Sequence, residues 1–292
     1  MKQRIIYSMI LLAFAVISCD PEYPTPTPAS TLNPVTGKPA GFPNANIMAI
    51  HASPNAGAVT LSVDNSAVDG SSISFGQKFP AAGVYSSAVP AGSRQIRVVS
   101  GTTSVLSTRP FLNGNTNHSF FAIGRAGITS SSRADRLRLI ELSNESLPAL
   151  PVGTPNTAHV RFFNFGLVTP TPADAPTTTT LAGISLKIDA ASPITAAPGG
   201  GFFLAPAATF PASAANTRAY AATTTTFTAF TVPAVGAGGN DYLLDVVQST
   251  NGNIILDDIS IKLVAGKVYT IALIGSNVPE EQSYQLYVIT HR

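Results

Sequence analysis

The sequence predicts an all-β fold, with two tandem immunoglobulin-like antiparallel β-sandwich domains that follow an export signal and a proline-rich tether. Three observations support this fold class. Short runs of β-prone residues show the period-two alternation of half-buried strands. Gly, Pro and Asn interrupt these runs at intervals of roughly 8–12 residues, which is the spacing of a sandwich or barrel. After residue 19 the 292-residue chain has no amphipathic pattern long enough for a helix of three turns.

The first 18 residues have the layout of an export signal. Lys2 and Arg4 precede an apolar stretch, residues 5–17, that is shorter than the roughly 20 residues of a membrane-spanning helix. Residues 16–19 read VISC and resemble a bacterial lipobox, in which a diacylglyceryl group is attached to the cysteine and the signal is cut before it. We therefore expect lipid attachment at Cys19, the single cysteine of the chain. The alternative is a secreted protein with one free thiol.

The lipid and the segment after it predict an anchored protein on a stalk. Stable attachment takes at least two acyl chains, and a mature lipoprotein carries two or three. Residues 19–44 are rich in Pro, Thr and Asn and have almost no large apolar side chain, so they cannot form a core. A proline-rich segment of this kind is extended and semi-rigid, at about 3.1 Å per residue. We therefore expect it to hold a folded body several nanometres from the membrane.

Composition narrows the classes of partner. Removal of Lys2 and Arg4 with the signal leaves 15 of the 17 basic residues, against 15 acidic ones, so the mature chain is formally neutral. A neutral chain lacks the basic surface that phosphate neutralisation requires, which argues against nucleic acid as a partner. No disulfide is available after Cys19, so the core alone must hold the fold. No cofactor motif is present, and we expect no cofactor.

The β-prone runs follow one another through the rest of the chain. They are residues 58–64, 95–99, 137–142, 243–247, 254–256, 259–263 and 284–289. Residues 249–253 separate two of these runs and contain the pair Asn251-Gly252. That pair suits a type I′ hairpin turn, which needs positive φ at both central residues.

The sequence also reads as a duplication. Residues 112–124 have an echo in 263–275, residues 85–91 in 227–234, and residues 59–64 in 184–189. The order is kept while the offset between the copies grows, as insertions in loops of the second copy would produce. Residues 167–180 and 190–226 are the low-complexity inserts. We therefore place the domains at residues 45–145 and 157–292, with a linker between them.

Several turn motifs resemble those of a known family. Residues 47–56 read IMAIHASPNA, the β-prone run 59–64 follows, and residues 89–92 read VPAG. This pattern resembles the domain-of-unknown-function family forty-three ninety-seven, whose members also have a late strand like residues 265–270. The opening of the second half, residues 159–165, has drifted from the pattern. The resemblance implies a bacterial cell-surface module of immunoglobulin-like type, and no activity comes with it.

A catalytic site is not expected. His51, Ser53 and Asp64 lie close in sequence, but no G-x-S-x-G elbow is present to raise a nucleophile. We expect His51 to fix its turn through hydrogen bonds, and we predict that the protein is not an enzyme.

A metal site is not expected either. Asp257 and Asp258, with Asp241, Asp245 and Asn253, form the densest group of oxygen ligands. Calcium prefers six to eight oxygens on a defined loop, and no D-x-D-x-D-G pattern occurs. Paired carboxylates at the end of a hairpin are usually solvated.

Two classes of function remain. The first is a non-catalytic, lipid-anchored cell-envelope protein that serves as a surface interaction, adhesion or structural module. The second is an accessory glycan-binding lipoprotein of a polysaccharide-uptake system. The candidate aromatic platforms for such a ligand are Tyr85, Tyr220, Tyr242, Phe202 and Phe203. The expected location is the outer membrane, bound through the acylated Cys19 and facing the exterior, with the periplasmic face as the alternative.

Overall fold

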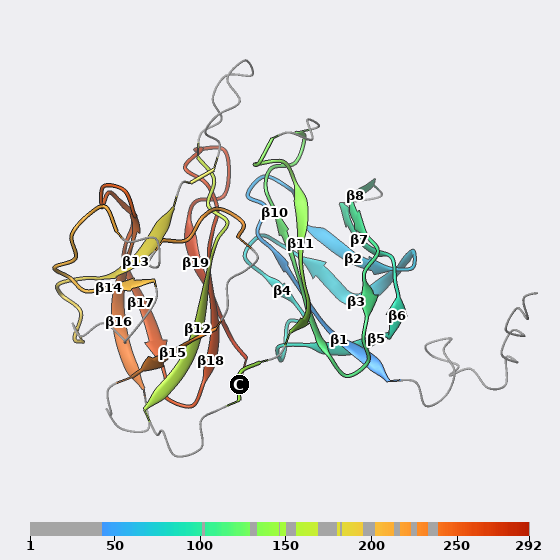
Figure 1. Ribbon diagram of the computed structural model, residues 1–292. Helices are drawn as coiled ribbons and strands as arrows, with labels where there is room; N and C mark the ends of the chain where they lie inside the picture. The colour runs from blue at the N-terminus through green and yellow to red at the C-terminus, as the bar shows by residue number, and fades with distance from the viewer. Residues whose placement is uncertain are drawn as a thin grey trace, which may run out of the picture. The chain divides into compact units, whose positions relative to one another are not determined.

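The structure is a computed structural model, shown in Figure 1. It describes residues 43–100, 103–128, 133–145, 147–149, 156–168, 180–181, 183–194, 202–212, 217–222, 227–232 and 239–291, and the structural statements below concern these residues. The predicted signal, Cys19, nearly all of the predicted tether, most of the first predicted insert and parts of the second lie outside them.

The described residues form nineteen strands and no helix, which confirms the all-β prediction. Every β-prone run named from the sequence lies in or overlaps a strand. In this part of the chain we find no helical segment with the length and apolarity needed to cross a membrane. The immunoglobulin-like topology remains a prediction.

The first half of the body, β1 to β11, forms two main sheets. One has the order β11 (Arg138–Glu145), β10 (Asn117–Ile123), β1 (Asn44–His51) and β4 (Lys78–Phe79), with β5 (Ser86–Pro90) also beside β1. The other has the order β3 (Ser66–Ile73), β2 (Val59–Val63), β7 (Ile96–Ser100) and β8 (Thr103–Thr108). A short pair, β6 (Gly92–Ser93) and β9 (Phe111–Leu112), stands apart from both.

The second half, β12 to β19, has a similar arrangement. One sheet has the order β15 (Thr228–Thr231), β12 (Thr157–Asn164), β18 (Val268–Ile274) and β19 (Gln285–Thr290). The other has the order β14 (Phe203–Leu204), β13 (Ile184–Ile188), β16 (Asn240–Gln248) and β17 (Ile254–Leu263). The three pairs of sequence echoes form strands at corresponding positions: β10 and β18, β5 and β15, and β2 and β13.

Three of the four main sheets are mixed, whereas the sequence predicted antiparallel sheets. The sheet of β14, β13, β16 and β17 is mixed because β13 runs parallel to β14. In the first half β1 runs parallel to β10, and in the second half β12 runs parallel to β18. Parallel neighbours need a long connection between them. In each half, the strands of the other sheet lie in that connection along the sequence.

Three apolar clusters fill the spaces between the sheets. One lies between the two sheets of the first half and one between the two sheets of the second half. The third, here called the interface cluster, joins the halves; its buried members are Met48, Ile50, Ala52, Phe121, Ile123, Ile140, Phe163, Phe165, Ala272, Ile274 and Ile289. Residues 43–292 accordingly form one compact unit.

Side chains on opposite faces of a central strand pack into two different apolar clusters. In β1, Ala45, Ile47 and Ala49 face the core of the first half, while Met48 and Ile50 belong to the interface cluster. Successive side chains of a strand point to opposite faces, so both faces of this sheet are covered. Strands that are buried on both faces read as nearly continuous apolar runs, as IMAI does in residues 47–50.

One hairpin turn differs from the sequence prediction, and positive φ at both central residues occurs in another hairpin. The hairpin between β16 and β17 is confirmed, but of its predicted central pair only Gly252 has positive φ, so the turn is not type I′. The two-residue loop between β2 and β3 has positive φ at both Asp64 and Asn65. The positive φ at both central residues that a type I′ turn needs therefore occurs at this hairpin.

Candidate functional site

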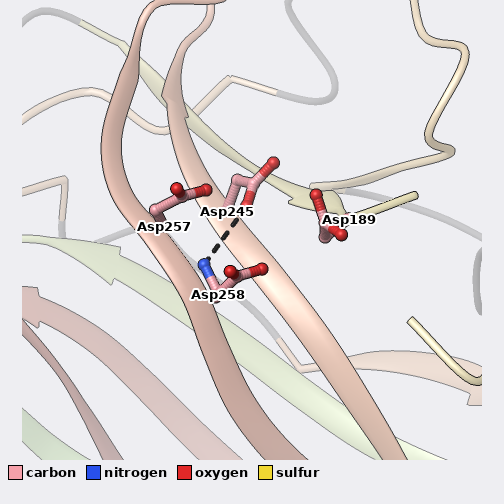
Figure 2. A group of neighbouring side chains, drawn as sticks. All are labelled: Asp189, Asp245, Asp257 and Asp258. Atoms are coloured by element: carbon pink, nitrogen blue, oxygen red, sulfur yellow. Dashed lines mark hydrogen bonds between the residues drawn. The ribbon is translucent and has the colours of Figure 1, made fainter. Parts of the chain in front are cut away.

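Four aspartates from three segments lie close together at the sheet of the second half that contains β13, β16 and β17 (Figure 2). Asp189 follows β13, Asp245 lies on β16, and Asp257 and Asp258 lie on β17. One carboxylate oxygen from each lies within 4.8 Å of the others. This is the densest group of metal-ligating side chains found among the described residues.

Strand pairing and a bulge bring these carboxylates together. Leu244 pairs with Ile259 and Val246 pairs with Leu256, so both Asp257 and Asp258 lie opposite Asp245. Asp258 has φ of 54°, the left-handed conformation that an extra residue in a strand can require. The bulge therefore presents two consecutive carboxylates to one position of β16.

Burial controls the charge at the centre of the cluster. Asp245 is only 1% exposed, and burial raises the pKa of its carboxyl above the ordinary value of 3.8. Asp189 and a hydrogen bond with Asp257 act in the same direction on this pKa. The amide of Asp258, 3.4 Å from Oδ1, and the Lys187 ammonium, 3.5 Å from Oδ2, oppose the shift.

The cluster has the chemistry to share a proton or to hold a hard divalent cation. Calcium takes six to eight oxygen ligands, so four carboxylates would leave positions for water. Carboxylate clusters near a surface also occur without an ion, and the expectation of no metal stays a prediction. The sequence analysis named Asp245, Asp257 and Asp258 but missed Asp189, which is far away in sequence and reaches the group through the pairing of β13 with β16.

The other two residues proposed as oxygen ligands lie outside the cluster. Asp241 pairs with Lys262 at 3.9 Å on an exposed surface. Asn253 is in the β16–β17 turn, where its amide nitrogen donates to the side chain of Asn251.

His51 fixes the turn after β1, as the sequence analysis expected. Its Nδ1 accepts a hydrogen bond from the amide of Ser53 at 3.3 Å, and its Nε2 donates to the carbonyls of Gly57 and Ala56. Burial lowers the pKa of the imidazole below 6.5, although the two carbonyl contacts act in the opposite direction. The ring is therefore held neutral, with both nitrogens engaged by the backbone.

Asp64 does not complete a triad with His51. Its carboxylate accepts from the guanidinium of Arg94 at 3.0 Å and from the amide of Gln95 at 2.9 Å. These contacts belong to the β2–β3 turn. Asp64 is therefore close to His51 in sequence but stabilises a different loop.

Asn164 takes the place of His51 in the second half. Its Oδ1 accepts from the amide of Gly166, and its Nδ2 donates to the carbonyls of Leu181 and Arg218. Both side chains thus bond to the amide two residues later and hold a following loop. The turn survives although the Ala-Ser-Pro motif is lost in the second half.

The proposed aromatic platforms are mostly parts of the core. Phe202 and Tyr242 are fully buried, Phe203 is nearly so, and all three belong to the core cluster of the second half. Tyr220 is half-buried, with the Arg138 guanidinium 5.4 Å from its ring centroid. The three buried rings present no open face on which a sugar could stack.

Tyr85, the fifth platform candidate, belongs to a polar network between the halves. Its hydroxyl donates to Oε2 of Glu145 at 3.1 Å, and Ser119 donates to the same oxygen. Glu145 also pairs with Arg161 of β12, and both side chains are 5% exposed. Arg161 Nε then donates to Thr270 at 2.7 Å.

A second buried network joins the halves around Arg125. Its guanidinium bonds to Asp135 at 3.1 Å within the first half. Across the interface it bonds to Glu281 at 2.7 Å, to Ser276 at 2.9 Å and to the carbonyl of Val168 at 2.8 Å. Its side chain is only 3% exposed, so this cation depends on its protein partners rather than on water.

Comparison with known proteins agrees with the turn motifs. No curated protein matches the sequence. The family model described as "Domain of unknown function (DUF4397)" matches residues 45–171, a stretch that covers the first half and β12. The resemblance drawn from the HASPNA and VPAG turns is thereby confirmed for residues 45–171.

Proposed function

We propose that the protein is a non-catalytic, lipid-anchored component of a bacterial cell envelope, which presents its β-sheet body as an interaction, adhesion or structural module. The observation that carries this proposal is the VISC box at residues 16–19, followed at once by a proline-rich segment. The lipid would supply the attachment and the proline-rich segment the distance from the membrane.

The form of the body supports a presenting role. Asn44 begins β1 directly after the proline-rich segment, and the carbonyl of Pro43 accepts from the amide of Ala91. The point where the predicted tether meets the body is therefore fixed. Beyond that point, the interface cluster and two buried ion networks join both halves into one unit, which suits a rigid head on a stalk.

The decisive test is lipid labelling of the precursor in a bacterial host. The wild-type chain should incorporate labelled palmitate, and Cys19→Ala should leave the precursor unprocessed and unlabelled. Ser18→Ala, which keeps a small residue before the cysteine, is the matched control and should still be labelled. Palmitate incorporation into Cys19→Ala would refute the anchor.

A separate measurement tests which side of the outer membrane the body faces. We expect the body to face the exterior, because a proline-rich tether and a hydroxyl-rich body suit a protein that meets other surfaces. Proteinase added to intact cells should then cleave the protein, with residues 177–180 and 212–226 as the expected sites. Protection in intact cells, with cleavage only after lysis, would place the body in the periplasm.

The alternative function is glycan binding in a polysaccharide-uptake system. A cleft with a tyrosine in its lining, described next, favours this second candidate. A glycan array run beside a pull-down from intact cells separates the two functions, since a protein partner would appear only in the pull-down.

A further inference from the structure

A cleft of about 340 Å³ lies where the first half meets β19 of the second half. From the first half it is lined by Gly70 and Ser72 of β3, by Gln77 in the turn before β4, by Lys78 of β4 and by Ala81 after it. From the second half it is lined by Tyr287 of β19. Ligand sites often occur at such junctions, and this volume lies at the lower end of the usual 300–1,000 Å³.

One wall of the cleft is held firmly in place. In the turn before β4, the amide of Gly76 donates to the carbonyl of His51 at 2.8 Å, and the amide of His51 donates to the carbonyl of Gln77 at 3.1 Å. His51 is itself fixed by the turn that follows β1. This wall therefore keeps its shape without a ligand, which lowers the entropic cost of binding.

Glycines open the cleft, and the second half closes one side of it. Gly70 and Gly76 both have φ of 71°, and a Cβ at Gly76 would come within 2.3 Å of the Gln285 side chain. The two halves therefore approach closely at β19, next to Tyr287. A side chain at Gly76 would meet Gln285, whereas the space beside Gly70 is open and only its positive φ favours glycine there.

The polar groups of the lining suit hydroxyl groups. The Lys78 ammonium donates to the carbonyls of Pro80 and Gly83, which leaves one of its three donors for a ligand. Gln77 uses its Oε1 to accept from the amide of Ser74, which leaves the NH₂ group of its side chain. Ser72 is exposed and adds a hydroxyl that can donate or accept.

Tyr287 adds an aromatic surface. Its ring packs against the interface cluster, and burial raises the pKa of its hydroxyl to about 12. The phenol therefore stays protonated at physiological pH and keeps a hydrogen-bond donor. A ring with an apolar body and a polar tip suits a ligand that has both CH and OH groups.

We propose that this cleft binds a neutral mono- or disaccharide, with one sugar face against the Tyr287 ring and hydroxyls bonded to Lys78 and Gln77. A neutral ligand fits because Lys78 is the single charged residue of the lining and already donates to two carbonyls. An apolar ligand would remove water from the ammonium, amide and hydroxyl without replacing their hydrogen bonds. The proposal rests on the alternative function, glycan binding, and names its site.

Saturation-transfer NMR on the full chain tests this proposal, in a detergent without a sugar headgroup. The probes are glucose, galactose, mannose, N-acetylglucosamine, maltose, lactose and cellobiose. A ligand of this size in a small cleft should bind with a dissociation constant on the order of 1 mM. Tyr287→Ala should weaken the binding at least about tenfold, while Tyr287→Phe, which keeps the ring, should stay within about threefold.

A second variant blocks the cleft without removing a contact. Ala81 lies in the lining and is exposed, so Ala81→Trp should fill the space, leave the thermal midpoint unchanged and abolish binding. Phe111→Ala, which removes an exposed ring on β9, is the matched control and should bind like the wild type. Saccharide binding that survives both Ala81→Trp and Tyr287→Ala would overturn the site but keep glycan binding. If no probe binds, both the site and glycan binding are refuted, while the proposal of an anchored surface module is unaffected.

Discussion

Arg125 and Ser276 occupy corresponding positions in the two halves and contact each other, with Arg125 Nη2 donating to Ser276 Oγ at 2.9 Å. Each follows a glycine of positive φ, Gly124 or Gly275, at the end of β10 or β18. Corresponding residues that touch lie close to a two-fold axis. The two halves therefore meet as the subunits of a symmetric dimer do, although one chain contains both.

Removal of Arg125 should strongly destabilise the body. Arg125→Ala leaves the buried carboxylates of Asp135 and Glu281 without this partner. Breaking a buried ion pair from one side typically costs about 3–5 kcal/mol. We expect the free energy of unfolding in urea to fall by about that amount. Lys262→Ala is the control, because its pair with Asp241 is exposed, and it should change this free energy by less than about 0.5 kcal/mol. Equal effects of the two substitutions would contradict the role of the Arg125 network.

Each half should fold by itself but with reduced stability. Residues 45–146 and 157–292 each retain a core cluster of their own, so each fragment should show β-type circular dichroism and a cooperative melt. Each fragment would also expose its side of the interface cluster, including Phe121 or Phe163. We therefore expect the fragments to associate when mixed, with a rise in the midpoint of melting that depends on concentration. Two unfolded fragments would instead mean a single intertwined domain.

His51 should make stability depend on pH below about 6.5. Its pKa is lower in the folded state than the ordinary 6.5, so the unfolded chain binds the proton more readily. The stabilisation is complete above 6.5 and is lost as pH falls toward the folded-state pKa. His51→Asn copies the residue at position 164 and should remove this part of the pH dependence, as measured by urea unfolding between pH 5 and 8.

The matched variant for the same position is His51→Ala. It leaves the amide of Ser53 without its side-chain acceptor, a loss of about 1–3 kcal/mol for a buried group. His51→Asn should therefore be more stable than His51→Ala at pH 7.5. The reverse order would contradict the equivalence of His51 and Asn164.

Asp245 should have the opposite pH signature. Its pKa is raised in the folded state, so the ionised form is disfavoured there and stability falls as pH rises from about 4 through the folded-state pKa. Asp245→Asn should raise the thermal midpoint at pH 7 and change it little at pH 3.5. The buffer should contain EDTA, so that a divalent cation cannot neutralise the cluster. Asp241→Asn, on the exposed surface, should shift neither midpoint, and a lower midpoint for Asp245→Asn at pH 7 would refute this account.

The sequence located many of the strands because their signals are local, although it indicated neither β3 nor β8. Alternation located residues 59–63 and 259–263, and the echo between residues 112–124 and 263–275 located two corresponding strands. The pairing of β1 with β10 was not predictable in this way. Two parallel strands far apart in sequence carry no turn signal between them, and the direction of pairing depends on the whole sheet.

In the candidate sites, too, contacts between residues far apart in sequence could not be predicted. Asp257 and Asp258 were noticed because they are adjacent, whereas Asp189 joins them only through the register of β13 with β16. Phe202 and Tyr242 read as possible sugar platforms because aromatic residues look alike in a loop and in a core. Tyr287 was not named as a ligand contact because its run predicts a strand and nothing in it indicates a cleft. Burial on the second face of a sheet depends on a partner that the local sequence does not contain.

The interface cluster also has a consequence for folding during synthesis, because it can be completed only when the last strands have been made. β1 and β10 are made early, yet Met48, Ile50 and Phe121 are covered by strands that end with β19, the last of the described strands. Until those strands have been synthesised and have folded, the first half exposes its apolar side of the interface cluster to solvent. A chain that crosses a membrane unfolded would need a holding chaperone, or rapid completion of β18 and β19, to avoid premature association through that face.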